Sequence, residues 1–237
     1  MSTVPDETQS LGDAAYQQLR SDIVSCRLAP GQRLTERSLA EETGFGISPI
    51  RDALTRLDHE GLVRTLPRKG YQVTPLTLKL VDDLFTLWAI VGPEIARLGL
   101  RDVTGEQHRR LMAIVREMTG LRAAPALADG DIGLRLASLA GDTFTLLAGA
   151  TGNDYLINVH QRLRHDMDRI WVLSAQGGGP VPDPGMDQRL VTLFDQRDGA
   201  GAAAAVRASI IEMHHQALRI FSRWPSVTAT EITPLPA

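Results

Sequence analysis

Four cations between residues 37 and 69 have side chains suited to holding DNA: Arg37, Arg51, Arg68 and Lys69. The guanidinium of arginine presents paired donors that match phosphate oxygens and the edge of guanine. Residues 1–75 carry nine Lys and Arg against ten Asp and Glu, and the whole chain has a net charge of −3. This is not the charge of a protein that coats nucleic acid without specificity. DNA contact would therefore depend on placing a few cations on one face.

The elements that would position these cations follow the order helix, helix, helix, hairpin. Apolar residues recur at helical spacing from residue 11, and a Pro-Arg-Lys-Gly turn joins two short apolar stretches. Thr35 is predicted to cap the second helix, Gly44 to end it, and Ser48 to cap the third, with Pro49 in its first turn. The expected helices span 11–25, 36–43 and 48–60, and the expected strands span 62–66 and 70–74.

The third helix has the composition of a DNA-reading element at its N-terminal end. Such a helix presents its first residues to base edges and phosphates. Here the sequence offers Gly46, Ile47, Ser48 and Arg51. Arg51 lies one turn beyond Ser48, so both side chains can face the groove together.

Further contacts are expected on either side of this helix. Arg37, at the start of the second helix, would bind a phosphate. Arg68 and Lys69 at the hairpin tip would reach the minor groove or the backbone, and Gly70 would let the tip approach closely. Two other arginines are expected to be solvated surface residues: Arg56 and Arg64.

The order of these residues resembles the winged helix-turn-helix of the GntR family of bacterial repressors. The resemblance covers residues 11–75 and rests on the stretch Leu34–Leu54, its continuation Arg56–Val63, and the tip at 67–70. It implies a sequence-specific regulator that binds double-stranded operator DNA. The family often has serine, arginine and threonine where this chain has Gly46, Ile47 and Ser48. Because isoleucine cannot bond a guanine but could touch a thymine methyl, the operator cannot be inferred from relatives.

From residue 78 onward the apolar pattern is helical throughout. Six or so antiparallel helices are expected, and such a bundle can hold a pocket at its centre. Pro93 falls inside one apolar stripe, so that helix is expected to kink or break. The expected fold class is mainly α, a winged helix-turn-helix (α+β) followed by an all-α antiparallel bundle. The expected segments are a flexible tail (1–10), the DNA-binding domain (11–75), a linker (76–79), an effector-binding and dimerisation domain (80–222) and a C-terminal tail (223–237).

The helical half resembles the effector-binding FCD-like domain of the FadR-type branch of the GntR family. The helix number, the domain order and the stretch Ala148–Asn153 carry this resemblance. Many members of this branch bind a metal through an aspartate and a histidine four residues apart and two histidines on the last two helices. An alignment on Phe144 places the four metal positions at Gly141, Thr145, Gln188 and Ser209. It places a family arginine that pairs with an effector's carboxylate at Trp88. The resemblance therefore implies an effector site formed by these five residues.

These residue types indicate no metal and no other cofactor, because neutral side chains are poor ligands for a transition metal. A shift of the alignment by one residue would instead make Asp142 a ligand. The histidines offer no substitute: His214 and His215 are adjacent, and His160 and His165 are five residues apart, so neither pair shares a helical face. All four are expected to be surface or hydrogen-bonded residues.

The residue at the family's arginine position bears on the effector. With Trp88 there, a polyanionic acid would lack its partner, so an apolar or aromatic small molecule is expected, held by a few hydroxyl and amide hydrogen bonds. Trp171 is expected to be a core residue, and Trp88 is equally compatible with the core and with a ligand platform.

The sequence indicates a cytoplasmic location and no membrane contact. The first ten residues are polar, no run approaches the roughly 18 apolar residues of a membrane span, and Cys26 is the single cysteine. One cysteine cannot form an internal disulfide, which fits a reducing compartment.

The function predicted is a transcription regulator, a repressor, whose operator affinity is controlled by an effector. The alternatives are an activator, a metal-dependent organic-acid sensor of the same family, an enzyme in the helical half, or a scaffold that only dimerises. No nucleophile elbow, phosphate loop, HExxH or CxxC is present, so no enzyme is expected. A homodimer is expected, because one recognition helix buries too little surface for tight binding. The apolar stripes of the helical domain are the expected interface, and the helix around 80–98 is a candidate part of it.

Overall fold

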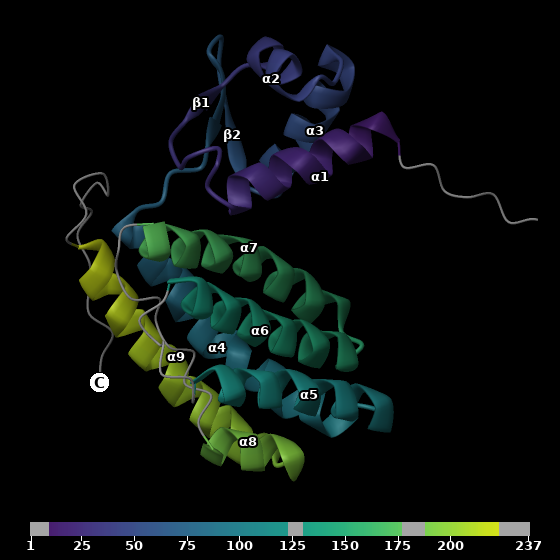
Figure 1. Ribbon diagram of the computed structural model, residues 1–237, viewed down its shortest axis with the longest axis vertical. Coiled ribbons are helices and arrows are strands. Elements are labelled where there is room, and N and C mark those ends of the chain that lie inside the picture. Colours follow the sequence, from purple (N-terminus) through teal and green to yellow (C-terminus); the bar gives the residue numbers. More distant parts are fainter. Residues whose placement is uncertain (1–9, 123–129, 177–187, 223–237) are drawn as a thin grey trace, which may run out of the picture. The chain divides into compact units, whose positions relative to one another are not determined.

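A computed structural model of the chain describes residues 10–122, 130–176 and 188–222 (Figure 1). The chain divides into two compact units, Met1–Leu76 and Thr77–Ala237. Of the expected tails, 1–10 and 223–237, only Ser10 lies within the described residues, where it caps the first helix. The fold is mainly α, as predicted.

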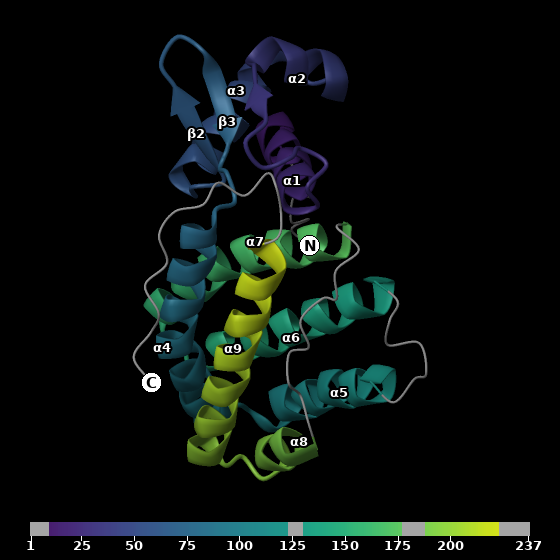
Figure 2. The same cartoon turned by 90° about the vertical axis from the view of Figure 1, so that its left-hand side faces the viewer.

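The first unit is a winged helix-turn-helix. Its elements are α1 (Leu11–Val24), β1 (Arg33–Leu34), α2 (Glu36–Thr43), α3 (Ile47–His59), β2 (Val63–Leu66) and β3 (Gly70–Val73). The strands pair antiparallel in the order β1-β3-β2, and Figure 2 shows β2 and β3 side by side. Apolar residues at helical spacing on α1 and α3 form the core. The larger side chains among them that are no more than 1% exposed are Leu19, Ile23, Ile50, Leu54 and Leu57.

The ends of α2 follow the predicted chemistry. The hydroxyl of Thr35 accepts the backbone N–H of Ser38 at 3.1 Å, which satisfies one of the amides that a helix start leaves without a partner. Gly44 ends the helix with φ +78°, a left-handed conformation that glycine adopts without strain. The short α2 is thereby fixed in front of α3.

The predicted cap of α3 is wrong by two residues. The helix begins at Ile47 and its N-cap is Gly46, which makes no side-chain hydrogen bond, whereas Ser48 was the expected cap. Pro49 occupies the third helical position and has no N–H, so a capping side chain at residue 46 would find no donor there. Ser48 lies inside the first turn instead and is exposed.

The hairpin turn between β2 and β3 lies close to β1. A β-carbon on Gly70 would be 2.5 Å from the carbonyl oxygen of Leu34, and Gly70 has φ +81°. Only glycine fits both the backbone conformation and the approach. The preceding Arg68 also has positive φ, at 62°. The turn is therefore set by the pairing of β3 with β1 as well as with β2.

The second unit is helical in all of its described part. Its elements are α4 (Leu78–Asp102), α5 (Gly105–Arg122), α6 (Gly130–Ala150), α7 (Asp154–Gln176), α8 (Gln188–Asp195) and α9 (Gly199–Phe221). Helix α4 lies against α9 and α6, and α6 also packs on α5 and α7 (Figures 1 and 2). Helix α4 begins at Leu78, two residues before the expected start, because Thr77 caps it by accepting the N–H of Leu80 at 3.0 Å. Thus α6, α7 and α9 pack on α4, whereas α5 packs on α6 and α8, and α8 on α9.

Pro93 does not break α4, contrary to one form of the expectation. The helix continues through it from Leu78 to Asp102. Since proline has no N–H, the carbonyl oxygen of Ala89 loses its donor within the helix. Arg207 of α9 supplies another, because its Nη1 donates to that oxygen at 2.8 Å.

Candidate DNA interface and effector pocket

The N-terminal end of α3 presents an accessible edge. Gly46, Ile47, Ser48 and Arg51 are all exposed, Ile47 with 44% of its surface open. Large apolar side chains are usually covered, and this one is free to touch an apolar group such as a thymine methyl. The structure thus brings the four predicted contact residues together at one end of a helix.

Arg51 is held by Glu36 across the turn between α2 and α3. Its Nε donates to Oε1 at 2.9 Å and its Nη2 donates to Oε2 at 2.8 Å, a bidentate pair. This hydrogen bonding lowers the pKa of the Glu36 carboxyl. The side chain of Arg51 remains 60% exposed. The guanidinium is therefore accessible and oriented at the same time.

The other predicted DNA cations have more freedom. The Nε of Arg37 donates to Glu41 at 3.0 Å, one turn along α2, and 86% of the arginine side chain is exposed. Arg68 and Lys69 are exposed at the turn and form no ion pair with any residue that the structure describes. Charges of this kind are available to a polyanion without breaking a strong internal contact.

Arg56 and Arg64 are exposed, as expected, but both have partners in the first unit. Nη1 of Arg56 donates to Asp13 at 2.6 Å, and its guanidinium lies 3.9 Å from the ring centre of Tyr16. Arg64 donates twice to the side-chain oxygen of Gln72, at 3.0 and 2.6 Å. These arginines contribute to the packing of the unit itself.

The second unit contains a pocket lined by residues of α4, α6, α7, α8 and α9. The centres of water molecules could occupy about 70 Å³ of it, whereas one water needs only about 10–15 Å³ on this measure. Three aromatic side chains form much of its wall: Trp88, Phe144 and Trp171. The first two meet edge to face, with ring centres 4.7 Å apart. The pocket therefore has room and an apolar surface for a small organic molecule.

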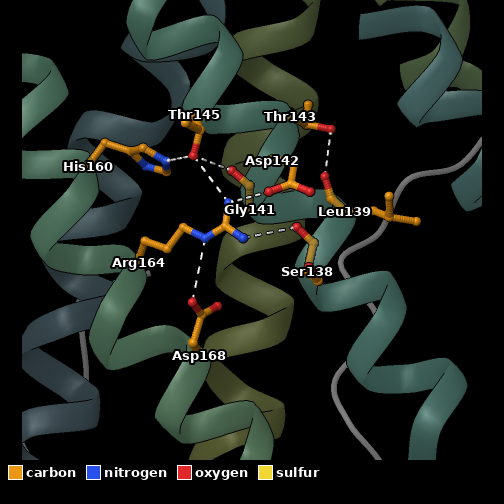
Figure 3. A network of polar contacts seen from close by, with 9 residues as sticks. All are labelled: Ser138, Leu139, Gly141, Asp142, Thr143, Thr145, His160, Arg164 and Asp168. Atoms are coloured by element: carbon orange, nitrogen blue, oxygen red, sulfur yellow. Dashed lines mark hydrogen bonds and ion pairs between the residues drawn. The ribbon is translucent and has the colours of Figure 1, made fainter. Parts of the chain in front are cut away.

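The polar end of the pocket is a network around Arg164 of α7 (Figure 3). Its Nη1 donates to Asp142 at 2.9 Å and to the hydroxyl of Thr145 at 3.2 Å, and its Nη2 donates to the carbonyl oxygen of Ser138 at 3.3 Å. Its Nε lies 3.5 Å from a carboxylate oxygen of Asp168. Only a fifth of the arginine side chain is exposed. The network thus fixes one cation between α6 and α7.

The structure places three of the five predicted effector residues in the pocket wall: Trp88, Gly141 and Ser209. Thr145 does not line it but contacts two residues that do, His160 and Arg164. Gln188 is exposed as the first residue of α8, and Leu190 of the same helix lines the pocket instead. Their role in binding an effector stays a prediction.

The residues at the family's metal positions do not fit a metal. A β-carbon on Gly141 would lie 2.6 Å from the guanidinium carbon of Arg164, so a positive group already fills the place that an aspartate would occupy. Asp142, the alternative ligand, pairs with the same arginine. Within the described ranges, no three His, Cys, Asp or Glu residues gather to hold an ion. A second cation beside Arg164 would be repelled.

His160 is a pocket residue that the sequence analysis did not identify. It is 3% exposed and has the hydrogen-bonded setting of the two that were expected, since its Nε2 lies 3.0 Å from the hydroxyl oxygen of Thr145. Burial first, and the nearby Arg164 second, lower the pKa of His160 to about 4. The imidazole is therefore neutral at pH 7.

Arg164 and Asp168 were missed with it, although a signal existed. The three residues are four apart along α7, so they share one helical face. Spacing between histidines alone, at positions 160 and 165, does not reveal the spacing from His160 to Arg164. The partners of Arg164 on α6 are 19 to 26 residues away and could not be found by local periodicity.

His214 is also buried, at 4% exposed, and has the polar partner that was expected as the alternative to a surface position. Its Nε2 lies 3.0 Å from a carboxylate oxygen of Asp82, and its ring stacks on Phe85 with centres 5.1 Å apart. Burial lowers the pKa of His214, while the Asp82 carboxylate acts in the opposite direction. It connects α9 to α4 outside the pocket.

Two family descriptions match the chain in the order of its two units. The family described as "Bacterial regulatory proteins, gntR family" matches residues 11–73, and the FCD domain matches residues 83–212. The FCD match alone covers more than half of the chain. Within the described residues, none of the helices combines the length and the apolar character that crossing a membrane requires.

Relatives of these families resemble parts of the chain. It is 38% identical over 72 residues to the uncharacterized HTH-type transcriptional regulator YdhC of Bacillus subtilis, covering 30% of this chain and 32% of that protein. It is 26% identical over 125 residues to the HTH-type transcriptional repressor RspR of Escherichia coli, covering 49% of this chain and 55% of RspR. The matched segment thus spans between a third and about half of these two relatives.

A solved structure supports the fold over a greater length. E. coli McbR/YncC superposes with a TM-score of 0.70, covering 90% of this chain and 98% of that one, at 18% sequence identity. At this identity the likeness concerns the fold alone.

Proposed function

Because the chain belongs to the GntR family of bacterial regulatory proteins and carries an FCD domain, we propose that it is a transcription repressor whose affinity for operator DNA depends on a small molecule. The observation that carries this proposal is the exposed end of α3, where Arg51 is oriented by Glu36 beside Ile47 and Ser48. The packing of the described part of the first unit does not account for the exposure of these side chains, which leaves binding of a partner as the explanation.

The DNA contacts follow from this edge and from the turn between β2 and β3. Arg51 and Ser48 would contact base edges, and Ile47 would touch a thymine methyl. Arg37, Arg68 and Lys69 would bind phosphates or enter the minor groove, while Gly70 fixes the turn that carries two of these cations and Gly46 keeps the helix end open. Phosphate contacts set the orientation on the duplex, and the three residues of α3 supply the sequence preference.

The effector site is the pocket of the second unit. Its apolar wall supports a small apolar or aromatic molecule, as the sequence suggested. One premise of that suggestion was wrong, because the pocket does contain a cation: Arg164 on α7, in place of the family arginine at position 88. Effector binding would favour one of two arrangements of the regulator, with a coupling of about 1–3 kcal/mol between effector and DNA.

A homodimer would give two recognition helices for two half-sites. Large apolar side chains are exposed on the two long helices α4 and α9, which pack on each other: Leu87, Ile90 and Ile211. Such side chains support α4 and α9 as the interface between two copies. The repressor role is supported by the relative RspR, which is named a transcriptional repressor. A chromosomal operator would place the protein in the cytoplasm.

Selection of DNA from random sequence tests the proposal. The full-length chain is incubated with a random duplex library at physiological salt, and bound DNA is amplified and sequenced. The expected result is a two-fold symmetric motif with half-sites one or more helical turns apart. Enrichment of no motif, or of a motif that binds no tighter than random DNA of equal length, would refute the proposal.

A further inference from the structure

The guanidinium of Arg164 has little capacity left for a ligand. An arginine carries five N–H groups. Two of them serve Asp142 and Thr145, one serves the carbonyl of Ser138, and the Nε–H faces Asp168. One N–H remains. A carboxylate that bound the guanidinium with both oxygens would have to displace at least one of these partners.

The charge around the guanidinium also opposes an anion. Arg164 supplies one positive charge, and Asp142 and Asp168 supply two negative charges within 3.5 Å of it. The neighbouring His160 is neutral at pH 7. The polar end of the pocket therefore carries a net charge of about −1, and a carboxylate buried there would meet two others.

Hydrogen-bond acceptors, in contrast, are in excess. The hydroxyl of Thr145 donates to the carbonyl of Gly141 at 2.9 Å, so it accepts from Arg164 and from the Nε2–H of His160 (Figure 3). This assigns the imidazole proton to Nε2 and leaves Nδ1 as an acceptor. That Nδ1 is buried and has no hydrogen-bond partner. An unsatisfied buried acceptor costs about 1–3 kcal/mol, which a suitable donor would recover.

Ser209, on the α9 side of the pocket, also offers a hydrogen-bond acceptor. Its hydroxyl donates to the carbonyl oxygen of Ala205 at 3.1 Å, so only its lone pairs face other groups. The pocket thus combines aromatic walls with acceptors contributed by His160, Ser209 and Asp168. Its complement is a molecule with an aromatic body and an N–H or O–H group.

We infer that the pocket recognises a neutral aromatic alcohol or phenol, whose hydroxyl donates to Nδ1 of His160, and that it rejects aromatic carboxylates. A neutral donor is favoured over an ammonium group because most of the wall is apolar and Asp142 is nearly half exposed to water. Because water does not reach Nδ1 in the free protein, contact with it requires a small rotation of the imidazole or of a neighbour. Only the regulatory consequence of this binding rests on the proposed function.

Four probes with the same carbon skeleton test the inference on the unmodified full-length protein. They are benzyl alcohol, benzylamine, benzoate and toluene, titrated at pH 7 while the indole N–H signals of Trp88 and Trp171 are followed by NMR. Benzyl alcohol should bind about fivefold more tightly than toluene, since one hydrogen bond is gained. Benzoate should bind at least about tenfold more weakly than the alcohol, because its charge is buried beside two carboxylates.

Each other ranking overturns the inference. Tightest binding of benzoate would mean that Arg164 exchanges its partners for the ligand. Tightest binding of benzylamine would identify a cation site, and equal binding of toluene and benzyl alcohol would mean that the acceptors contribute nothing. A lack of response to all four probes, up to their solubility, would exclude the pocket for this class.

A variant locates the donor's partner. His160→Phe keeps an aromatic ring but removes Nδ1, so it should lose the preference for benzyl alcohol over toluene. Arg162→Ala, at an exposed position of the same helix, should keep it. If His160→Phe retains the preference, the acceptor is wrongly assigned. If benzyl alcohol binds as expected but leaves affinity for the selected DNA unchanged, the effector role fails while the chemistry of the pocket stands.

Discussion

The guanidinium of Arg164 occupies the space in which a side chain of Gly141 would begin. A β-carbon there would lie 2.6 Å from Cζ and 2.7 Å from Nη1 of the arginine. This glycine has no unusual backbone conformation to explain it, since it lies within α6. Its role is to let an arginine of α7 reach the backbone carbonyl of Ser138.

Gly141→Ala should separate two opposing effects in one helix. Alanine favours a helix over glycine by about 1 kcal/mol, but at this position it expels the Arg164 guanidinium from its partners. Gly149, also in α6, has no atom within 4 Å of its added β-carbon and is the matched control. Urea unfolding should show the Gly141 variant about 1–2 kcal/mol less stable than the Gly149 variant. In an Arg164→Ala background the difference should vanish, and its persistence there would contradict this account.

Arg51→Ala should weaken binding to the selected operator by about 1–3 kcal/mol if the arginine reads a base edge. The measurement is fluorescence anisotropy at physiological salt. Arg109→Ala, exposed on α5, is the control and should bind as the parent does. Arg56→Ala should reduce stability more than DNA affinity, because Arg56 is engaged by Asp13 and Tyr16. An Arg51 variant with unchanged affinity would show that α3 is wrongly placed as the reading element.

Arg207→Ala should leave the carbonyl oxygen of Ala89 without a donor, because Pro93 has no N–H to serve it within α4. Loss of the 2.8 Å bond to Ala89 should cost about 1 kcal/mol of unfolding free energy. In a Pro93→Ala background the new N–H of residue 93 can serve the same carbonyl, so removing Arg207 should then cost less. Equal costs in both backgrounds would mean that Arg207 acts through packing alone.

His160 should make the protein less stable in mild acid. Its pKa of about 4 lies below the ordinary 6.5, so between these values the unfolded chain binds a proton that the folded chain excludes. The contribution of the neutral His160 to the free energy of unfolding is fully present above pH 6.5. It falls as the pH drops toward 4, by about 1.4 kcal/mol per pH unit and about 3 kcal/mol in all. Urea unfolding at pH 7 and pH 5 should show a smaller loss for His160→Gln than for the parent, whereas His59→Gln, at an exposed position, should lose as much as the parent. A parent-like loss in the His160 variant would contradict the assignment.

Ile90→Asp should disrupt the proposed dimer. Ile90 is 59% exposed on α4, and a carboxylate in an apolar interface would be buried without a partner. Sedimentation velocity at micromolar concentration should show a shift toward monomer. Leu11→Asp, equally exposed in the first unit at 68%, should leave the oligomeric state of the parent intact. A parent that is itself monomeric would refute the dimer.

The sequence predicts the helices well because apolar spacing reports directly on buried faces, as at Leu19, Ile23 and Ile50. It misplaced the start of α3 because a capping serine next to proline looks the same whether it lies before or inside the first turn. The wall of the pocket could be reached in part through the resemblance, which led to Trp88 and Ser209. Its polar end could not be predicted, because the contacts of Arg164 depend on how closely α6 and α7 approach each other. The only sign of that approach in the sequence is the glycine at position 141, which leaves room for the guanidinium.

The bidentate pair of Arg51 and Glu36 bears on how the protein distinguishes one duplex from another. Random DNA can offer Arg51 a phosphate, but that phosphate must replace a carboxylate that already satisfies two N–H groups. The exchange gains little, and it leaves the negative charge of Glu36 facing the backbone of the duplex. A guanine edge presents two acceptors in a fixed geometry and carries no full charge, so the pair can open toward it with less repulsion. Under the proposed function, the internal carboxylate would therefore lower affinity for DNA in general and shorten the time spent on sites that lack the right base.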